Sequence, residues 1–120
     1  MFHNVDKKLQ VIGGGKMGAA LLGGLLSSGH KPEGVLVIEP SASRAEELTE
    51  SYGVRVSDRI EPSQGSIIAT KPDVVLTVAS QVAEVGTNRL LSVAAGVTLS
   101  AIGEATGGAI PIVRAMPNTP

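Results

Sequence analysis

The stretch "KLQVIGGGKMGAALLGG" (residues 8–24) contains three glycines in the spacing G-x-G-x-x-G, at Gly13, Gly15 and Gly18. An apolar run before them predicts a buried strand over 8–14, and small and apolar residues after them predict a helix over 17–29. In this context Gly13 permits a tight turn, Gly15 lets a pyrophosphate approach the backbone, and Gly18 lets the helix pack close to the sheet. The stretch therefore predicts a dinucleotide-binding turn between a strand and a helix.

The rest of the chain continues the alternation of strand and helix. Further strands are predicted over 35–39, 54–56, 66–70, 90–96 and 111–116, and further helices over 41–53, 72–86 and 99–108. Such alternation with short loops is typical of a parallel sheet with right-handed crossovers. We expect an α/β fold, a Rossmann-type doubly wound parallel sheet of three layers with strand order 3-2-1-4-5-6. The whole of 1–120 is expected to form one NAD(P)-binding domain.

Composition narrows the class of protein. Aromatic residues make up only 2% of the chain against 42% for all hydrophobic residues, so the core must be aliphatic, which suits a buried parallel sheet. A formal charge of −1 argues against nucleic acid or an acidic membrane as partner. With no cysteine there is neither a disulfide framework nor a thiolate metal site, and no metal is expected. No apolar run is long enough to span a membrane and no signal core precedes the domain, so a cytoplasmic protein is expected.

The second predicted strand ends at Glu39, 21 positions after Gly18, where an acid is expected to bond the adenosine ribose. A carboxylate there favours NAD over NADP because it repels a 2′-phosphate. Ser41, Ser43 and Arg44 follow directly and offer groups that bind such a phosphate. The alternative is that Ser41 caps the next helix and Arg44 is solvated. The sequence alone therefore does not decide between NAD and NADP as the coenzyme.

Three other stretches end predicted strands: "ATKP" (69–72), "VAAG" (93–96) and "MPNT" (116–119). Ligands of open α/β sheets bind beyond the carboxyl ends of the strands, where the strand order reverses, here between the first and fourth strands. Lys71 is therefore expected at the mouth of the crevice, with the Ala-Ala-Gly run beside the coenzyme. The alternatives are an exposed lysine, packing of helix on sheet by the small residues, and an Asx turn at Asn118.

Together these stretches resemble the N-terminal domain of the pyrroline-5-carboxylate reductase family. The resemblance is carried by "VIGGGKMGAALLGGLL" (11–26), "ATKP" (69–72), "VAAGVTL" (93–99) and "RAMPNTP" (114–120), in that order. It implies hydride transfer from reduced NADP or NAD to the small-molecule substrate 1-pyrroline-5-carboxylate, which yields L-proline. It also implies a helical second domain, absent from these 120 residues, that forms the homo-oligomer and supplies most substrate contacts. The 120-residue chain alone is therefore expected to be inactive.

The resemblance further implies which residues meet the coenzyme. The glycine loop would bind the pyrophosphate, Ser41 the side of the adenosine ribose, 69–72 the cleft, 94–96 the nicotinamide ribose, and 116–118 the nicotinamide and substrate. No catalytic residue is assigned, because no His/Asp or carboxylate pair has catalytic spacing. The complete set of expected coenzyme-binding residues is Gly13, Gly14, Gly15, Lys16, Met17, Gly18, Glu39, Ser41, Ala69, Thr70, Lys71, Pro72, Ala94, Ala95, Gly96, Met116, Pro117 and Asn118.

Two other functions compete with this one. The first is another reductase with the same glycine loop, such as a hydroxyacid dehydrogenase or a deazaflavin-dependent NADP reductase, in which "RAMPNTP" is not expected. The second is a non-catalytic nucleotide-binding module that acts through a partner. Turnover of pyrroline-carboxylate against hydroxyacids separates the reductases.

Overall fold

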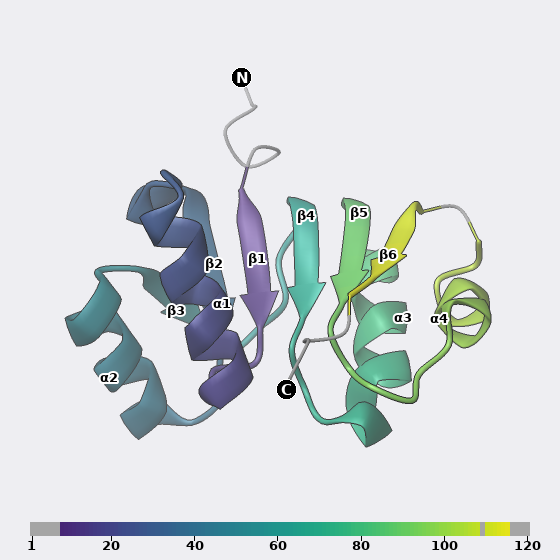
Figure 1. Cartoon of the computed structure of the whole chain (residues 1–120), viewed down its shortest axis with the longest axis horizontal. Helices are drawn as coiled ribbons and strands as arrows, with labels where there is room; N and C mark the ends of the chain where they lie inside the picture. Colours follow the sequence, from purple (N-terminus) through teal and green to yellow (C-terminus); the bar gives the residue numbers. More distant parts are fainter. Residues whose placement is uncertain (1–7, 109, 116–120) are drawn as a thin grey trace.

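The structure, a computed structural model, describes residues 8–108 and 110–115. Its centre is a six-stranded parallel sheet in the order β3-β2-β1-β4-β5-β6 (Figure 1), which confirms the predicted fold and strand order. The chain order of the elements is β1 (Leu9–Ile12), α1 (Lys16–Ser27), the 3₁₀ turn η2 (Pro32–Gly34), β2 (Val35–Ile38), α2 (Ala42–Tyr52), β3 (Arg55–Ser57), β4 (Ser63–Ile68), the 3₁₀ turn η3 (Pro72–Val74), α3 (Val75–Val85), β5 (Thr87–Ser92), α4 (Leu99–Ala105) and β6 (Ile112–Arg114).

Two layers of helices enclose the sheet. α1 and α2 cover the half formed by β1, β2 and β3, and α3 and α4 lie on the half formed by β4, β5 and β6 (Figure 1). Leu22 of α1 and Leu48 of α2 belong to one buried cluster, which also contains Val11 of β1. Ile102 of α4 belongs to a second cluster with Ile12, the next residue of β1. Because successive strand residues point to opposite faces, β1 contributes to both clusters and is buried on both sides.

Local signals in the sequence give α2 its ends. The hydroxyl of Ser41 accepts a hydrogen bond from the backbone N–H of Arg44 (3.4 Å), so the predicted N-cap is confirmed. At the other end Gly53 adopts a left-handed conformation with φ of 71°, which favours glycine, and its N–H returns to the carbonyl of Thr49. These caps fix where the chain enters and leaves the helix, and so where β2 ends and β3 begins.

Two strands begin earlier than predicted. β4 starts at Ser63 and β5 at Thr87, and each begins three residues before the predicted start at Ser66 or Leu90. The additional residues are polar apart from Gly65, so they do not have the apolar pattern of a buried strand. Their backbones nonetheless pair in register, Ser63 with Thr87, because strand pairing uses main-chain groups that every residue carries. The helix predicted over 72–86 is also divided, into the 3₁₀ turn η3 and α3.

The connection from β3 to β4 has no helix. Residues 58–62 pass from the edge strand across β2 and β1 and reach β4 on the far side of the centre. Three strand spacings amount to about 14 Å, and five residues span at most about 18 Å, so this crossover segment is extended. Ile60, within the segment, packs against the cluster that contains Ile12. Every other connection between consecutive strands of this sheet contains a helix. Because this segment has none, a groove remains between it and α3.

Candidate functional site

The candidate site lies at the carboxyl ends of the central strands. β2 and β4 flank β1, and Ile12 pairs with Ile38 on one side and Ile68 on the other. The chain leaves β1 toward α1 and leaves β4 toward α3, on opposite faces of the sheet. Hydrogen bonds from Gly13 N–H to the Ile38 carbonyl (3.0 Å) and from Ala69 N–H to the Ile12 carbonyl (2.9 Å) tie the loop ends to neighbouring strands. The loops after β1 and β4 are thus held at the point where the strand order reverses, and they form the rim of the candidate site.

Two glycines of the motif are required by packing. Gly13 has a φ of 111°, and a Cβ there would lie 2.7 Å from the carbonyl oxygen of Ala69. A Cβ at Gly18 would overlap the carbonyl oxygen of Gly13. Gly13 and Gly18 therefore bring the β1–α1 loop against both the end of β4 and the first turn of its own helix.

Gly15 differs from both, because its surroundings are open. A Cβ at Gly15 would meet no atom within 4 Å, and the residue is the N-cap of α1 without a side-chain cap. Lys16 and Met17, which begin the helix, are also exposed. The first backbone N–H groups of a helix have no partner within it, and they lie at the positive end of its dipole. An anion fits this cradle, and a side chain at Gly15 would fill the space it needs.

Glu39 connects the loop between β1 and α1 to the loop between β2 and α2. Its Oε1 accepts the N–H of Gly14 (3.0 Å) and its Oε2 accepts the N–H of Ser41 (2.9 Å). Arg44 approaches from α2 and donates from Nε to the carbonyl oxygen of Gly14. Its Nη1 forms an ion pair with Glu47 (3.0 Å). Arg44 is therefore not simply solvated: it connects the first turn of α2 to the glycine loop.

A groove with a volume of about 460 Å³ opens beside this rim. Gly13, Pro40 and Thr70 contribute the strand ends, and the opposite walls come from the crossover segment and α3. Most of the lining is apolar, and charged and amide side chains also contribute to it. A volume and lining of this kind suit part of a small organic ligand with a flat ring. The crossover and helix residues that line it are Asp58, Arg59, Ile60, Val78, Gln81, Glu84 and Val85.

The end of β4 supplies the next expected contacts. Ala69 lies against Gly13, Thr70 lines the groove, and Lys71 and Pro72 are exposed where the 3₁₀ turn begins. The hydroxyl of Thr70 donates to the carbonyl of Lys71 (3.3 Å). Of these residues only Thr70 lines the groove, and Lys71 is exposed in the loop that follows it.

The small residues after β5 separate into two environments. Ala94 is 6% exposed and belongs to the cluster with Val97 and Ile102, so its side chain packs between helix and sheet. Ala95 and Gly96 are exposed, and Gly96 has a φ of 80°. The structure brings only the latter two to the surface of the loop. The expected contacts Met116, Pro117 and Asn118 lie outside the described residues.

The sequence patterns missed the groove walls and the contact between Arg44 and Gly14. No motif marks the crossover segment, because its residues come together with the other groove walls only when the segment crosses the sheet.

Across the described part of the chain, no group of three or more His, Cys, Asp or Glu side chains is placed to hold a metal ion. Within 8–108 and 110–115, no helix has both the length and the apolar character to cross a membrane.

The reversed strand order, the open N-terminus of α1 behind a glycine turn, and an acid at the end of β2 define a Rossmann-type dinucleotide-binding domain. A sequence model of the family described as NADP oxidoreductase, coenzyme F420-dependent, matches residues 8–96, and the chain belongs to that family.

Among known proteins the chain is similar to pyrroline-5-carboxylate reductases. It is 37% identical to that of Escherichia coli over 97% of this chain and 46% of the relative, and 31% identical to that of Corynebacterium melassecola over 93% and 45%. A solved pyrroline-5-carboxylate reductase from Coxiella burnetii superposes with a TM-score of 0.84 at 28% identity, covering 95% of this chain and 45% of that one. The chain thus spans about half the length of the curated relatives it matches. The family to which it belongs is one of NAD(P)-dependent oxidoreductases.

Proposed function

We propose that this chain is the coenzyme-binding half of a pyrroline-5-carboxylate reductase. One observation carries the proposal: similarity to those reductases runs along almost the whole chain, in sequence and in three-dimensional structure. The reaction would reduce the C=N bond of 1-pyrroline-5-carboxylate to give L-proline. When bound, reduced nicotinamide supplies a hydride to the imine carbon, the ring nitrogen takes a proton, and oxidised coenzyme is left.

The task of this chain in that reaction is to bind and orient. The backbone N–H groups of Gly15, Lys16 and Met17 are suited to hold the pyrophosphate, since all three residues are exposed and a Cβ at Gly15 would meet no atom within 4 Å. Holding the coenzyme in one orientation lowers the entropic cost of bringing donor and acceptor together. The exposed backbone at Ala95 and Gly96 suits the nicotinamide ribose. The roles of Met116, Pro117 and Asn118 stay predictions.

The adenosine end belongs, on this proposal, in the groove beside Glu39. A carboxylate has about four acceptor positions, and the two backbone N–H groups use only two of them. The remainder can accept the hydroxyls of an unmodified ribose, whereas a 2′-phosphate would meet a negative charge. NADH is therefore the preferred coenzyme in this proposal, with NADPH the weaker ligand.

A chimera tests the function. The corresponding half of the Escherichia coli relative is replaced by this chain, and oxidation of NADH and NADPH is followed with and without 1-pyrroline-5-carboxylate. We expect substrate-dependent oxidation by the chimera. The 120-residue chain alone is the control, and the resemblance predicts that it binds coenzyme without turnover. A folded chimera that binds NADH but leaves the substrate unreduced would contradict the proposal.

The description of the matched family supports a second candidate, hydride exchange between NADP and the deazaflavin coenzyme F420. Adding F420 and NADPH to the same chimera tests this candidate, since F420 reduction without activity on the imine would favour it. The division into two domains and oligomerisation through the second remain predictions of the resemblance. A cytoplasmic location remains a prediction from the apolar pattern of the sequence.

A further inference from the structure

Two consecutive peptide groups of the glycine loop are held by side chains from the segment after β2. The N–H of Gly14, in the peptide between Gly13 and Gly14, donates to Glu39. The carbonyl of Gly14, in the peptide between Gly14 and Gly15, accepts from Nε of Arg44. One acidic and one basic side chain therefore fix neighbouring peptide planes of the loop.

The planar trans peptide turns these contacts into an orientation of the binding groups. A carbonyl and the N–H that follows it lie in one plane and point in opposite directions. Holding the Gly14 carbonyl toward α2 therefore turns the N–H of Gly15 away from α2. That N–H is one of the open groups at the N-terminus of α1, where nothing lies within 4 Å of a Cβ position at Gly15.

We propose that Arg44 is a positioning residue for coenzyme binding, which acts by holding the Gly14–Gly15 peptide with its N–H toward the pyrophosphate. The inference rests on the proposed dinucleotide site. Glycine has wide backbone freedom, so three consecutive glycines without restraint would populate many loop shapes, and the apparent affinity falls with the fraction that is competent. This role differs from that of an arginine that binds a 2′-phosphate directly.

The other contacts of Arg44 do not account for its placement. Its ion pair with Glu47 joins side chains that are 35% and 65% exposed, and such exposed pairs contribute little. Its backbone N–H serves the cap at Ser41, and any residue other than proline would supply that donor. The Nε contact with Gly14 is the one that reaches across 30 positions of sequence to the loop.

The test compares Arg44→Gln with Arg44→Met in the 120-residue chain, titrated with NADH and with NADPH. Gln places its Nε2 donor the same number of bonds from the backbone as Nε of arginine, whereas Met has no donor there. We expect Arg44→Met to weaken both coenzymes by about tenfold with their ratio unchanged. Arg44→Gln is expected to recover most of that loss, and Glu47→Gln, which removes only the ion pair, to bind like the wild type. In NMR spectra the amide signal of Gly15 is expected to shift in Arg44→Met and not in Glu47→Gln.

Each outcome bears on the proposal. Loss confined to NADPH in both Arg44 variants would overturn it in favour of a phosphate ligand. Unchanged affinity of a folded Arg44→Met, with an unmoved Gly15 signal, would overturn it as well while the proposed function stands. A wild-type chain that binds neither coenzyme would overturn both.

Discussion

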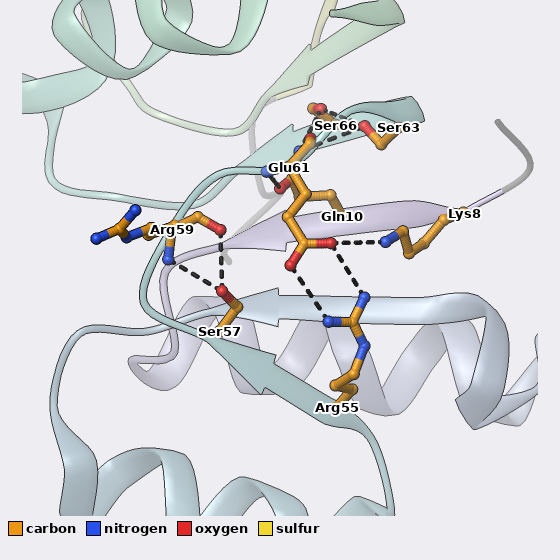
Figure 2. A network of polar contacts seen from close by, with 8 residues as sticks. All are labelled: Lys8, Gln10, Arg55, Ser57, Arg59, Glu61, Ser63 and Ser66. Atoms are coloured by element: carbon orange, nitrogen blue, oxygen red, sulfur yellow. Dashed lines mark hydrogen bonds and ion pairs between the residues drawn. The ribbon is translucent and has the colours of Figure 1, made fainter. Parts of the chain in front are cut away.

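The side chain of Gln10 pairs with the backbone of Glu61 in both directions. Its Oε1 accepts the N–H of Glu61 (2.8 Å) and its Nε2 donates to the carbonyl oxygen of Glu61 (2.9 Å), as Figure 2 shows. Gln10 is fully buried on the central strand β1, and Glu61 belongs to the crossover segment of residues 58–62. The glutamine amide thus serves as the hydrogen-bonding partner that a neighbouring strand would otherwise provide to this extended segment.

The pair continues into a buried polar network. Nε2 of Gln10 also lies 3.3 Å from the hydroxyl of Ser63 and 3.1 Å from that of Ser66, and Ser66 donates to the hydroxyl of Thr87 (3.1 Å). Together these contacts give buried polar groups the partners that burial demands. This network explains why β4 and β5 begin with the polar residues Ser63 and Thr87.

Replacing Gln10 by alanine is expected to destabilise the domain by about 2–4 kcal/mol, because it leaves a cavity and the N–H and carbonyl of Glu61 without that partner. Urea unfolding followed by circular dichroism measures the loss. Gln81→Ala is the matched control, since Gln81 is exposed on α3 and should change stability by less than about 0.5 kcal/mol. Equal effects of the two variants would contradict the role given to Gln10.

The free energy of unfolding is expected to depend on pH through the carboxylate of Glu61. Hydrogen bonds from Arg55 and then Lys8 lower the pKa of Glu61 from 4.5 to about 2 (Figure 2). Because the folded-state pKa is depressed, this stabilisation is complete above about pH 4.5 and is lost as the pH falls toward 2. With Glu61 30% and Arg55 57% exposed, screening reduces the contribution to about 1–2 kcal/mol.

Glu61→Gln checks this assignment, because it removes the titration while keeping the shape of the side chain. The free energy of unfolding, measured from pH 6 to pH 2 at low and high salt, should fall less steeply in the variant between about pH 4.5 and 2. Parallel curves for wild type and variant would assign the acid sensitivity to other carboxyl groups.

The glycines of the loop are expected to respond differently to substitution. Gly15→Val should leave the domain folded and abolish dinucleotide binding, because its side chain would enter open space that the pyrophosphate needs. Gly18→Ala should instead cost more than about 3 kcal/mol of stability, because the new Cβ overlaps the Gly13 carbonyl. Calorimetric titration and thermal unfolding of both variants separate the effects. Wild-type affinity in a folded Gly15→Val chain would refute the pyrophosphate assignment.

Glu39→Ala is expected to narrow the preference for NADH over NADPH, by roughly tenfold in the ratio of dissociation constants. The substitution removes an acceptor for the ribose hydroxyl together with a charge that repels a 2′-phosphate. Loss of the contact with Gly14 should weaken both coenzymes as well. An unaltered ratio would mean that Glu39 does not face the ribose.

Short-range patterns in the sequence are sufficient for the frame of this protein. The glycine spacing at 13–18, the apolar runs, and the signals at Ser41 and Gly53 predict the strands and the helix ends, because each depends on residues close together in the chain. The sheet order is predicted because alternating strands and helices behind a glycine turn are typical of the doubly wound fold. They also indicate the end of the sheet at which a nucleotide binds.

The contacts that complete the site and the core depend on long-range packing. Gln10 meets Glu61 across 51 positions, and Arg44 meets Gly14 across 30, so no local period connects them. The packing role of Ala94 could likewise be assigned only from the structure. In the sequence, an alanine within a run of small residues suits either a coenzyme-binding surface or a helix–sheet interface. These contacts form because the strand order places β1 beside β4 and because α2 packs over the glycine loop. Each buried polar group then forms a hydrogen bond with a partner that is near it only in the folded chain.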